Sequence, residues 1–220
     1  MVKVQDRPKP SPREAEPEAL VRERLIDAVV VETVESGYAG LSVERVVKRA
    51  EVSRSTFYVH FANKQAAVEA AHERVFERFF VRMLRASDAQ PEWPLKVKVG
   101  IGVTLDMAAA SPVHARFLAL DALAANRELA RHAIEGRDRL TRLLAGGRAE
   151  SPFGASLPPI TEQVLIAGIA GAISARLVTG EAEHLPSLAP QLVQLTLLPY
   201  LGAEDAAKVA RRPRRAVSDQ

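Results

Sequence analysis

A group of side chains suited to contacting nucleic acid lies just after Ser53. Arg54, Ser55, Thr56 and Tyr58 are spaced to share the outward face of one short helix. Guanidinium, hydroxyl and phenol groups donate hydrogen bonds to phosphate oxygens or reach base edges in a groove. These residue types at this spacing indicate contact with DNA.

The residues around this group indicate how such a helix would be held. Phe57 and Phe61 are four positions apart, so both can pack inward on the opposite face. His60 and Lys64 follow, where they can meet the nucleic-acid backbone again. Lys64 begins the next helix, whose free N-terminal amides favour a phosphate. Taken singly, Tyr58 could be an ordinary surface residue and His60 a helix-end hydrogen bonder. Their joint spacing favours DNA contact.

The preceding residues predict the bracing helix of a helix-turn-helix. Apolar residues recur at helical spacing from Val43 to Ala50, after Ser42, whose hydroxyl is a good N-cap. A three-residue break ends at Ser53, a second N-cap, and Asn63 caps a longer helix that starts at Lys64. Two short helices joined by a tight turn are typical of a motif that places its second helix in the major groove.

The sequence here resembles the tetracycline-repressor (TetR) family of bacterial regulators. The resemblance covers about residues 20–64, and its clearest part is Thr56-Phe57-Tyr58 followed by His60-Phe61 and Asn63-Lys64. Further matching residues are Gly37-Tyr38, Leu41-Ser42-Val43, Val46-Val47-Lys48-Arg49-Ala50 and Val52-Ser53-Arg54-Ser55.

The resemblance implies a role for each matching position. Tyr58, His60 and Lys64 align with residues that contact phosphate in that family. Arg54, Ser55 and Thr56 align with base-reading positions. The start of the bracing helix, where hydroxyls or amides touch phosphate, corresponds to Ser42 and Val43. The complete predicted DNA-binding set is Ser42, Val43, Ser53, Arg54, Ser55, Thr56, Tyr58, His60 and Lys64.

One residue departs from this pattern. Glu44 stands where some members carry a basic or hydroxyl residue that contacts a base. A carboxylate near phosphate is unfavourable unless it accepts from a cytosine amine or pairs with Arg45 or Lys48. We therefore expect Glu44 to be a first-turn helix residue and not a base reader.

Composition narrows the function class. The 220 residues carry a net charge of +3 and no cysteine, which excludes a disulfide framework, a thiolate zinc site and a cysteine nucleophile. The five histidines lack metal-ligand spacing, and no Gly-x-Ser-x-Gly elbow occurs. We expect no enzymatic activity, no metal and no cofactor. The polar start of the chain lacks a signal peptide's apolar segment, and the apolar run 164–175 is too short to span a bilayer, which predicts a soluble, cytoplasmic protein.

Helical periodicity along the whole chain predicts an all-α fold without strands. We expect a proline-rich disordered arm at 1–17, a helix-turn-helix DNA-binding domain at 18–64, a helical regulatory and dimerisation domain at 65–202, and a basic disordered tail at 203–220. Within the third segment, the last two helices are expected at about 160–178 and 186–201. The tail could add non-specific attraction to DNA, or be a solvated segment without a role.

The resemblance also implies a small-molecule cavity in the larger domain. The apolar and polar candidates for its lining are Trp93, Met107, His114, Phe117, Leu118 and Asp121. A packed core with surface charges is an equally good interpretation, because pockets are mostly apolar and resemble cores in sequence.

The last helices predict a homodimer interface. Small residues that let helices approach closely crowd one helix, and leucines stripe the next, so two copies could form a four-helix bundle. The alternative is a core helix of a monomer. The predicted interface residues are Ala167, Gly168, Gly171, Ala175, Leu188, Leu192 and Leu195.

The sequence thus predicts a dimeric TetR-type transcriptional repressor. It would bind double-stranded DNA at a pseudo-palindromic operator and be released by a small-molecule effector, without a membrane partner. Two alternatives stay open: an all-α small-molecule-binding or enzymatic protein that does not read DNA, and a protein-interaction module built from the same helices.

Overall fold

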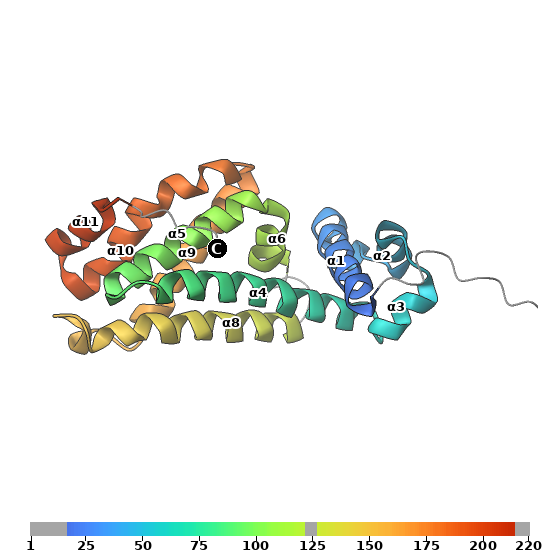
Figure 1. Ribbon diagram of the computed structural model, residues 1–220, viewed down its shortest axis with the longest axis horizontal. Helices are drawn as coiled ribbons and strands as arrows, with labels where there is room; N and C mark the ends of the chain where they lie inside the picture. Colours follow the sequence, from blue (N-terminus) through green and yellow to red (C-terminus); the bar gives the residue numbers. More distant parts are fainter. Residues whose placement is uncertain (1–16, 122–126, 214–220) are drawn as a thin grey trace, which may run out of the picture.

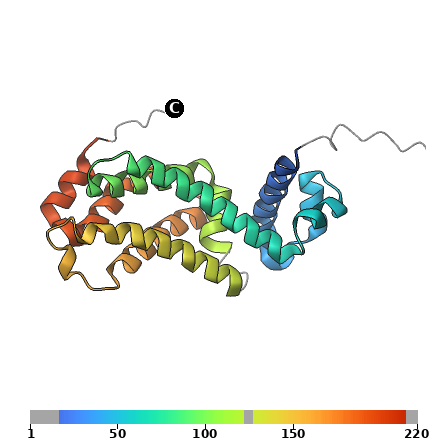
Figure 2. The ribbon, with the colours of Figure 1, turned by 60° about the horizontal axis from the view of Figure 1, so that its bottom comes forward.

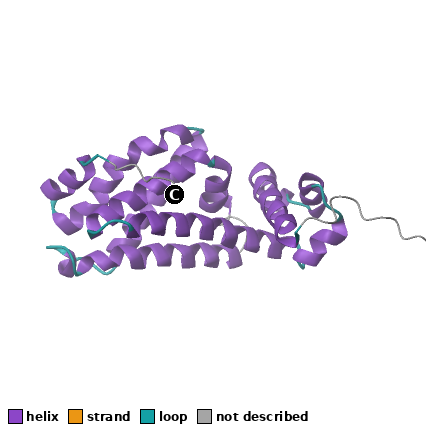
Figure 3. Ribbon diagram, viewed as in Figure 1, coloured by secondary structure: helices purple, strands orange, loops and turns teal. Residues whose placement is uncertain are grey.

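A computed structural model describes residues 17–121 and 127–213. All regular elements in these ranges are helices, and no strand occurs among them (Figure 3). The predicted all-α class is therefore confirmed. The molecule is elongated, with three helices forming a head at one end and the others forming a body (Figure 1). The head consists of α1 (Glu18–Gly40), α2 (Val43–Ala50) and α3 (Arg54–His60).

The helix ends of the head are capped as the sequence predicted. The Ser42 hydroxyl accepts from the Arg45 amide at 3.3 Å, and the Ser53 hydroxyl accepts from the Thr56 amide at 3.0 Å. The Asn63 side chain caps α4, accepting from the Ala66 amide at 2.9 Å. Each cap satisfies an amide that has no partner within its helix, so the three caps fix where α2, α3 and α4 begin.

The helix α4 (Lys64–Asp88) joins the two parts of the molecule. It leaves the head and runs along the body beside α8 and α5, as two views show (Figures 1 and 2). The remaining elements are α5 (Trp93–Ala110), α6 (Pro112–Arg116), a π-helical turn η2 (Phe117–Asp121), α8 (Arg127–Ala145), η3 (Gly146–Arg148), η4 (Gly154–Ser156), α9 (Thr161–Thr179), η5 (Ala182–Leu188), α10 (Ala189–Leu201) and α11 (Ala203–Arg211).

Two hydrophobic cores correspond to the head and the body. The head core combines α1, α2 and α3 with the first half of α4, including Val68 and Val75. The body core is built from α5, α8, α9, α10 and α11 around Leu105 and Leu197. Phe117 crosses this division: it comes from η2 in the body, yet it is fully buried in the head core. The head and the body are thus connected by packing as well as by α4.

The end of the chain differs from the prediction. Residues 203–220 were expected to be a disordered tail, but Ala203–Arg211 forms α11, which packs against α10 and α5. The buried Lys98 ammonium of α5 donates to the carbonyls of Val209 at 2.7 Å and Ala210 at 3.0 Å, and also to that of Arg212. A cation at a helix C-terminus satisfies carbonyls that lack amide partners. The disordered arm was expected at 1–17, and residues 1–16 of it lie outside the described residues.

Two further expectations need correction. The helix expected at 186–201 is divided into the 3-10 segment η5 and the helix α10. The apolar run 164–175 was expected to be too short for a membrane, but it belongs to a helix, α9, whose length and mean hydropathy of 1.3 would suffice by composition alone. Only 17% of that segment is buried within the chain. The helix therefore exposes apolar surface that one chain does not cover.

Candidate DNA-binding surface and effector cavity

The outward face of α3 presents the residues that the sequence singled out for DNA. Ser53, Arg54 and Ser55 are exposed, and the Tyr58 side chain is 47% exposed. Phe57 is fully buried on the other face and Phe61 is 96% buried, so the aromatic pair holds the helix as predicted. The neighbouring apolar residue, Val59, is 72% exposed, and sequence reasoning missed it. An exposed valine on such a face can contact a thymine methyl group.

Hydroxyl groups cluster at the start of α3. The Ser53 oxygen lies 2.7 Å from both the Ser55 and the Thr56 hydroxyl oxygens. Ser53 also caps the helix, so it positions the other two hydroxyls instead of being free itself. Ser55 and Thr56 keep lone pairs and rotatable hydroxyls that can exchange partners with phosphate or a base edge.

The Arg54 guanidinium is fixed between two side chains. It donates to the Glu44 carboxylate of α2 at 2.9 Å, and its carbon lies 5.8 Å from the centre of the Tyr58 ring. Tyr58 first, and then Glu44, raises the pKa of Arg54 above its ordinary value. Glu44 lies in the first turn of α2, as expected, and its ion-pair partner is Arg54, ten residues later, instead of Arg45 or Lys48. Glu44 thus orients Arg54 across the turn between the two helices.

The bracing helix is attached to α1 by a buried carboxylate. Glu32 is 96% buried and accepts from Arg49 Nε at 2.7 Å, while Arg45 Nε lies 2.6 Å from the other carboxylate oxygen. A second acid, Glu35, accepts from Arg49 at 2.5 Å. These ion pairs hold the Arg45 and Arg49 side chains of α2 toward α1. The two arginines therefore stabilise the packing of α2 on α1 and are not both free to contact phosphate.

Lys64 has an internal role that the sequence did not reveal. Its ammonium donates to the carbonyls of Tyr38 at 3.2 Å and Leu41 at 3.1 Å, and lies 4.8 Å from the centre of the Tyr38 ring. These carbonyls follow Gly37, whose φ of +67° makes the kink in α1. Lys64 therefore ties the kinked end of α1 to the start of α4. Ser42, Val43 and His60 lie half-buried beside the exposed face.

The sequence of the head matches a known family model. Residues 25–71 match the model of bacterial regulatory proteins of the tetR family. This chain has the helix-turn-helix of a TetR-family regulator. The match begins within α1, includes α2 and α3, and ends in the first turns of α4. No curated protein matches the chain in sequence.

Solved structures of transcriptional regulators share most of the fold. The fatty acid degradation regulator FadR from Bacillus halodurans is 23% identical, with a TM-score of 0.73 over 80% of this chain and 97% of that one. FadR from Bacillus subtilis, solved in complex with stearoyl-CoA, is 19% identical, with a TM-score of 0.70 over 80% and 98%. SmeT, the repressor of the Stenotrophomonas maltophilia multidrug efflux pump SmeDEF, is 22% identical, with a TM-score of 0.67 over 81% and 89%.

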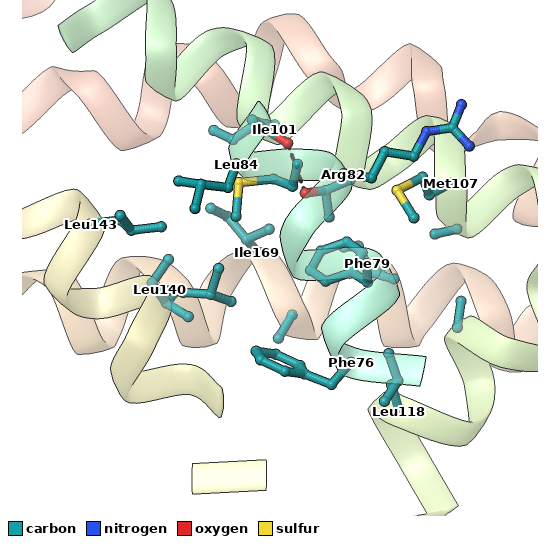
Figure 4. Close-up of a pocket in the computed structure, with 18 of the residues that line it drawn as sticks. Phe76, Phe79, Arg82, Leu84, Ile101, Met107, Leu118, Leu140, Leu143 and Ile169 are labelled. Atoms are coloured by element: carbon teal, nitrogen blue, oxygen red, sulfur yellow. Dashed lines mark hydrogen bonds between the residues drawn. The ribbon is translucent and has the colours of Figure 1, made fainter. Parts of the chain in front are cut away.

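A cavity of about 500 Å³ lies inside the body of this TetR-type fold. Its walls come mainly from α4, α5, α6, η2, α8 and α9. Apolar side chains of α4, α5, η2, α8 and α9 line it (Figure 4). The volume is typical of a small-molecule site. Four of the predicted candidates line it: Trp93, Met107, His114 and Leu118.

Two of the residues predicted to line the cavity, Phe117 and Asp121, are not among its described lining residues. Phe117 does not line the cavity, because the π-helical turn directs it into the head core while the next residue, Leu118, faces the cavity. The Asp121 side chain lies outside the described residues. Sequence reasoning missed the wall that α4 and α8 provide, which includes Phe76, Phe79 and Leu140 (Figure 4). Their helical spacing was visible, but it does not distinguish a cavity wall from a packed core.

The rim of the cavity is mainly basic. Arg78, Arg82, Lys96 and Arg137 line it, against the single acid Asp88. Lys96 lies 3.8 Å from Asp88, and Arg78 is paired with Glu23 of α1. The Arg82 side chain extends past Met107 toward the outside (Figure 4). It makes no ion pair with any residue that the structure describes.

The predicted dimer residues separate into two groups. Ala167, Gly168, Gly171 and Ala175 are all exposed on α9. They lie between Val164 and Val178, which are 59% and 64% exposed. On the following elements Leu195 is 59% exposed, whereas Leu188 and Leu192 are partly buried against the body core.

Proposed function

We propose that this protein is a homodimeric transcriptional repressor that binds a pseudo-palindromic operator and is released by a small-molecule effector. The observation that carries the proposal is the exposed face of α3, where Arg54, Ser55, Thr56 and Tyr58 stand on a helix anchored by Phe57. Such a helix fits the major groove. Tyr58, His60 and the Ser42–Val43 amides are proposed to contact phosphate, with Lys64 contributing only if it leaves its carbonyl partners.

Dimerisation is supported by the exposed apolar side of α9. Val164, Gly168, Gly171, Ala175 and Val178 follow each other at intervals of four and three residues, so they form one stripe along the helix. Small residues in the middle of the stripe allow close approach of a second helix. A twofold axis there would pair two heads for two half-sites. We also place Leu195 of α10 in this interface, because its side chain is 59% exposed.

The coupling between effector and DNA is proposed to run through α4 and η2. The first half of α4 belongs to the head core and its second half lines the cavity. In η2, Phe117 is buried in the head core, and the adjacent Leu118 both packs against that core and lines the cavity. An effector that binds one head orientation more tightly shifts the population toward it.

These contacts suggest which part of the chain carries which function. We place DNA binding in residues 18–64 and regulation and dimerisation in the helices from α4 onward, now extended to Arg211. The FadR and SmeT structures are those of regulators with the same fold, which supports a regulatory role in a cytoplasmic protein and not an enzymatic role. One FadR structure holds stearoyl-CoA, which supports an effector with an apolar chain.

The proposal is tested by titrating the protein against the DNA upstream of its own gene, with fluorescence anisotropy at several salt concentrations. Specific, salt-sensitive binding of two chains per site is expected. Tyr58→Ala should weaken binding and lower the slope of log K against log salt by about one unit for a lost phosphate contact. Arg142→Ala, at an exposed arginine of α8, is the control and should leave affinity unchanged. Equal binding by both variants contradicts the proposal.

A further inference from the structure

A buried histidine faces the cavity without a hydrogen-bond partner. His72 of α4 is 3% exposed and lines the cavity at the end nearest the head. Its ring lies 6.3 Å from that of Phe117, which offers no polar atom. No residue that the structure describes forms a hydrogen bond with either ring nitrogen. Buried polar groups in proteins are normally paired, so an imidazole with unused nitrogens at a cavity wall points to a missing partner.

Three hydroxyl groups of the wall are already used within the protein. Thr104 donates to the Gly100 carbonyl at 2.7 Å, and Thr196 donates to the Leu192 carbonyl at 2.7 Å. The Ser87 hydroxyl is directed to the Met83 sulfur at 3.8 Å. Two inner polar groups of the wall keep unused hydrogen-bonding capacity: the His72 ring, and the buried Trp93 Nε1–H at the start of α5, which has no partner among the described residues. Of the two, only the imidazole can accept a hydrogen bond as well as donate one.

The surroundings of His72 keep it uncharged. Burial, and then the neighbouring His132 of α8, lower the pKa of His72 to about 4. His132 itself has a buried Nδ1 with no hydrogen-bond partner. A neutral imidazole offers one N–H donor and one nitrogen acceptor. It is suited to a hydroxyl or carbonyl group and gives no charge to balance a carboxylate or phosphate in this apolar surrounding.

The cavity is also long. The residues of α4 that line it run from His72 to Asp88, which corresponds to about 24 Å along the helix axis. His72 is the first α4 residue of the cavity wall and lies at its head-proximal end, whereas Asp88 and Lys96 lie at the far end, where α4 ends and α5 begins. A ligand that fills the cavity must therefore be elongated, and the group that it places against His72 is buried.

We propose that the cavity binds an elongated apolar molecule whose buried end carries an uncharged hydroxyl or carbonyl group, hydrogen-bonded to His72 beside His132. The inference rests on the proposed effector role of the cavity and names the chemistry of its ligand. It makes His72 the residue that distinguishes a polar-ended chain from a hydrocarbon of the same length. It also places the ligand's polar group directly beside Phe117, where binding can affect the head.

The test compares two probes of equal length, 1-decanol and 1-fluorodecane, on the full chain. Binding is followed by the fluorescence of Trp93, the sole tryptophan, which lines the cavity. Wild type is expected to bind the alcohol about tenfold more tightly, as one added neutral hydrogen bond implies. The His72 ring signals in NMR spectra should shift with decanol and stay in place with fluorodecane.

Variants separate this contact from general packing. His72→Leu should bind both probes with less than about twofold preference, and His72→Gln should keep part of the preference for the alcohol. The matched control is Thr104→Val, since that hydroxyl is already used within α5, and it should keep the full preference. A preference that persists in His72→Leu overturns the proposal, as does failure of wild type to bind either probe.

Two further outcomes are informative. Decanoate bound more tightly than decanol, and equally by His72→Leu, would assign the polar end of the ligand to the basic rim and overturn the proposal. DNA binding is measured separately. If decanol binds through His72 but leaves operator affinity unchanged, the site is correct and the effector role fails. If no operator is bound at all, the repressor proposal fails while the ligand selectivity still stands.

Discussion

The head and the body bury their aromatic side chains in different ways. In the head, Phe57 and Phe61 are almost fully buried in a core shared with α1, α2 and α4. In the body, Phe76 and Phe79 border a cavity of about 500 Å³. The head core also comes from one stretch of sequence, residues 25–75, apart from Phe117. A locally built, filled core suits a part that must present one fixed surface, while the open body can accommodate a ligand.

The same substitution in the two regions should therefore have unequal effects. Phe57→Ala is expected to lower the free energy of unfolding by about 3–5 kcal/mol, because it removes a fully buried ring from a filled core. Phe79→Ala should cost less than about 1.5 kcal/mol, since its ring already borders empty space. Urea denaturation of both variants measures the difference. Equal losses would remove the distinction between the two cores.

Arg54→Ala tests whether the head carries the sequence specificity. Loss of a bidentate base contact should weaken operator binding by about 1–3 kcal/mol, and discrimination among operator variants should relax at one base pair. Thermal stability should be unchanged because the side chain is exposed. The measurement is anisotropy with a set of operators that vary one position at a time. Uniform weakening over all of them would assign Arg54 to phosphate instead.

His72 should make the body sensitive to acid. Its pKa of about 4 in the fold lies below the ordinary value of 6.5, so the unfolded chain takes up the proton first as pH falls. The contribution to stability is complete above about pH 6.5 and is lost as pH falls toward 4. At pH 5 the loss is about 2 kcal/mol. His72→Phe should flatten the stability profile between pH 7 and 5, measured by denaturation, whereas a control, His184→Gln at an exposed site, should not.

The smallest effect is expected at Glu44. Glu44→Gln should change the unfolding free energy by less than about 0.5 kcal/mol, because exposed ion pairs contribute little. If Glu44 orients Arg54, the variant should still weaken discrimination at the base pair that Arg54 reads. Removal of a negative charge alone would instead strengthen binding to all DNA, and the same operator set distinguishes the two results.

The sequence predicted the head well because its signals are local. Ser42, Ser53 and Asn63 act on amides three residues away, and Phe57 and Phe61 are one helical turn apart. The prediction from sequence failed where two interacting side chains or backbone groups are far apart in the chain. Glu44 meets Arg54 across a turn, and Lys98 meets carbonyls more than a hundred residues later, so α11 looked like a charged tail. The inner cavity wall was also missed, because apolar helical spacing is the same for filled and empty interiors.

The direction of Phe117 has a consequence for engineering hybrid regulators. One way to change the operator specificity would be to exchange the head for that of another regulator at a junction in the chain. Here residues 25–75 do not include everything that the head core needs, because Phe117 enters it from the body. A head taken from another regulator would have to pack against Phe117, a side chain that fits the core of the original head. A functional chimera would therefore have to carry position 117 with the head, or choose donors whose heads accept a phenylalanine there.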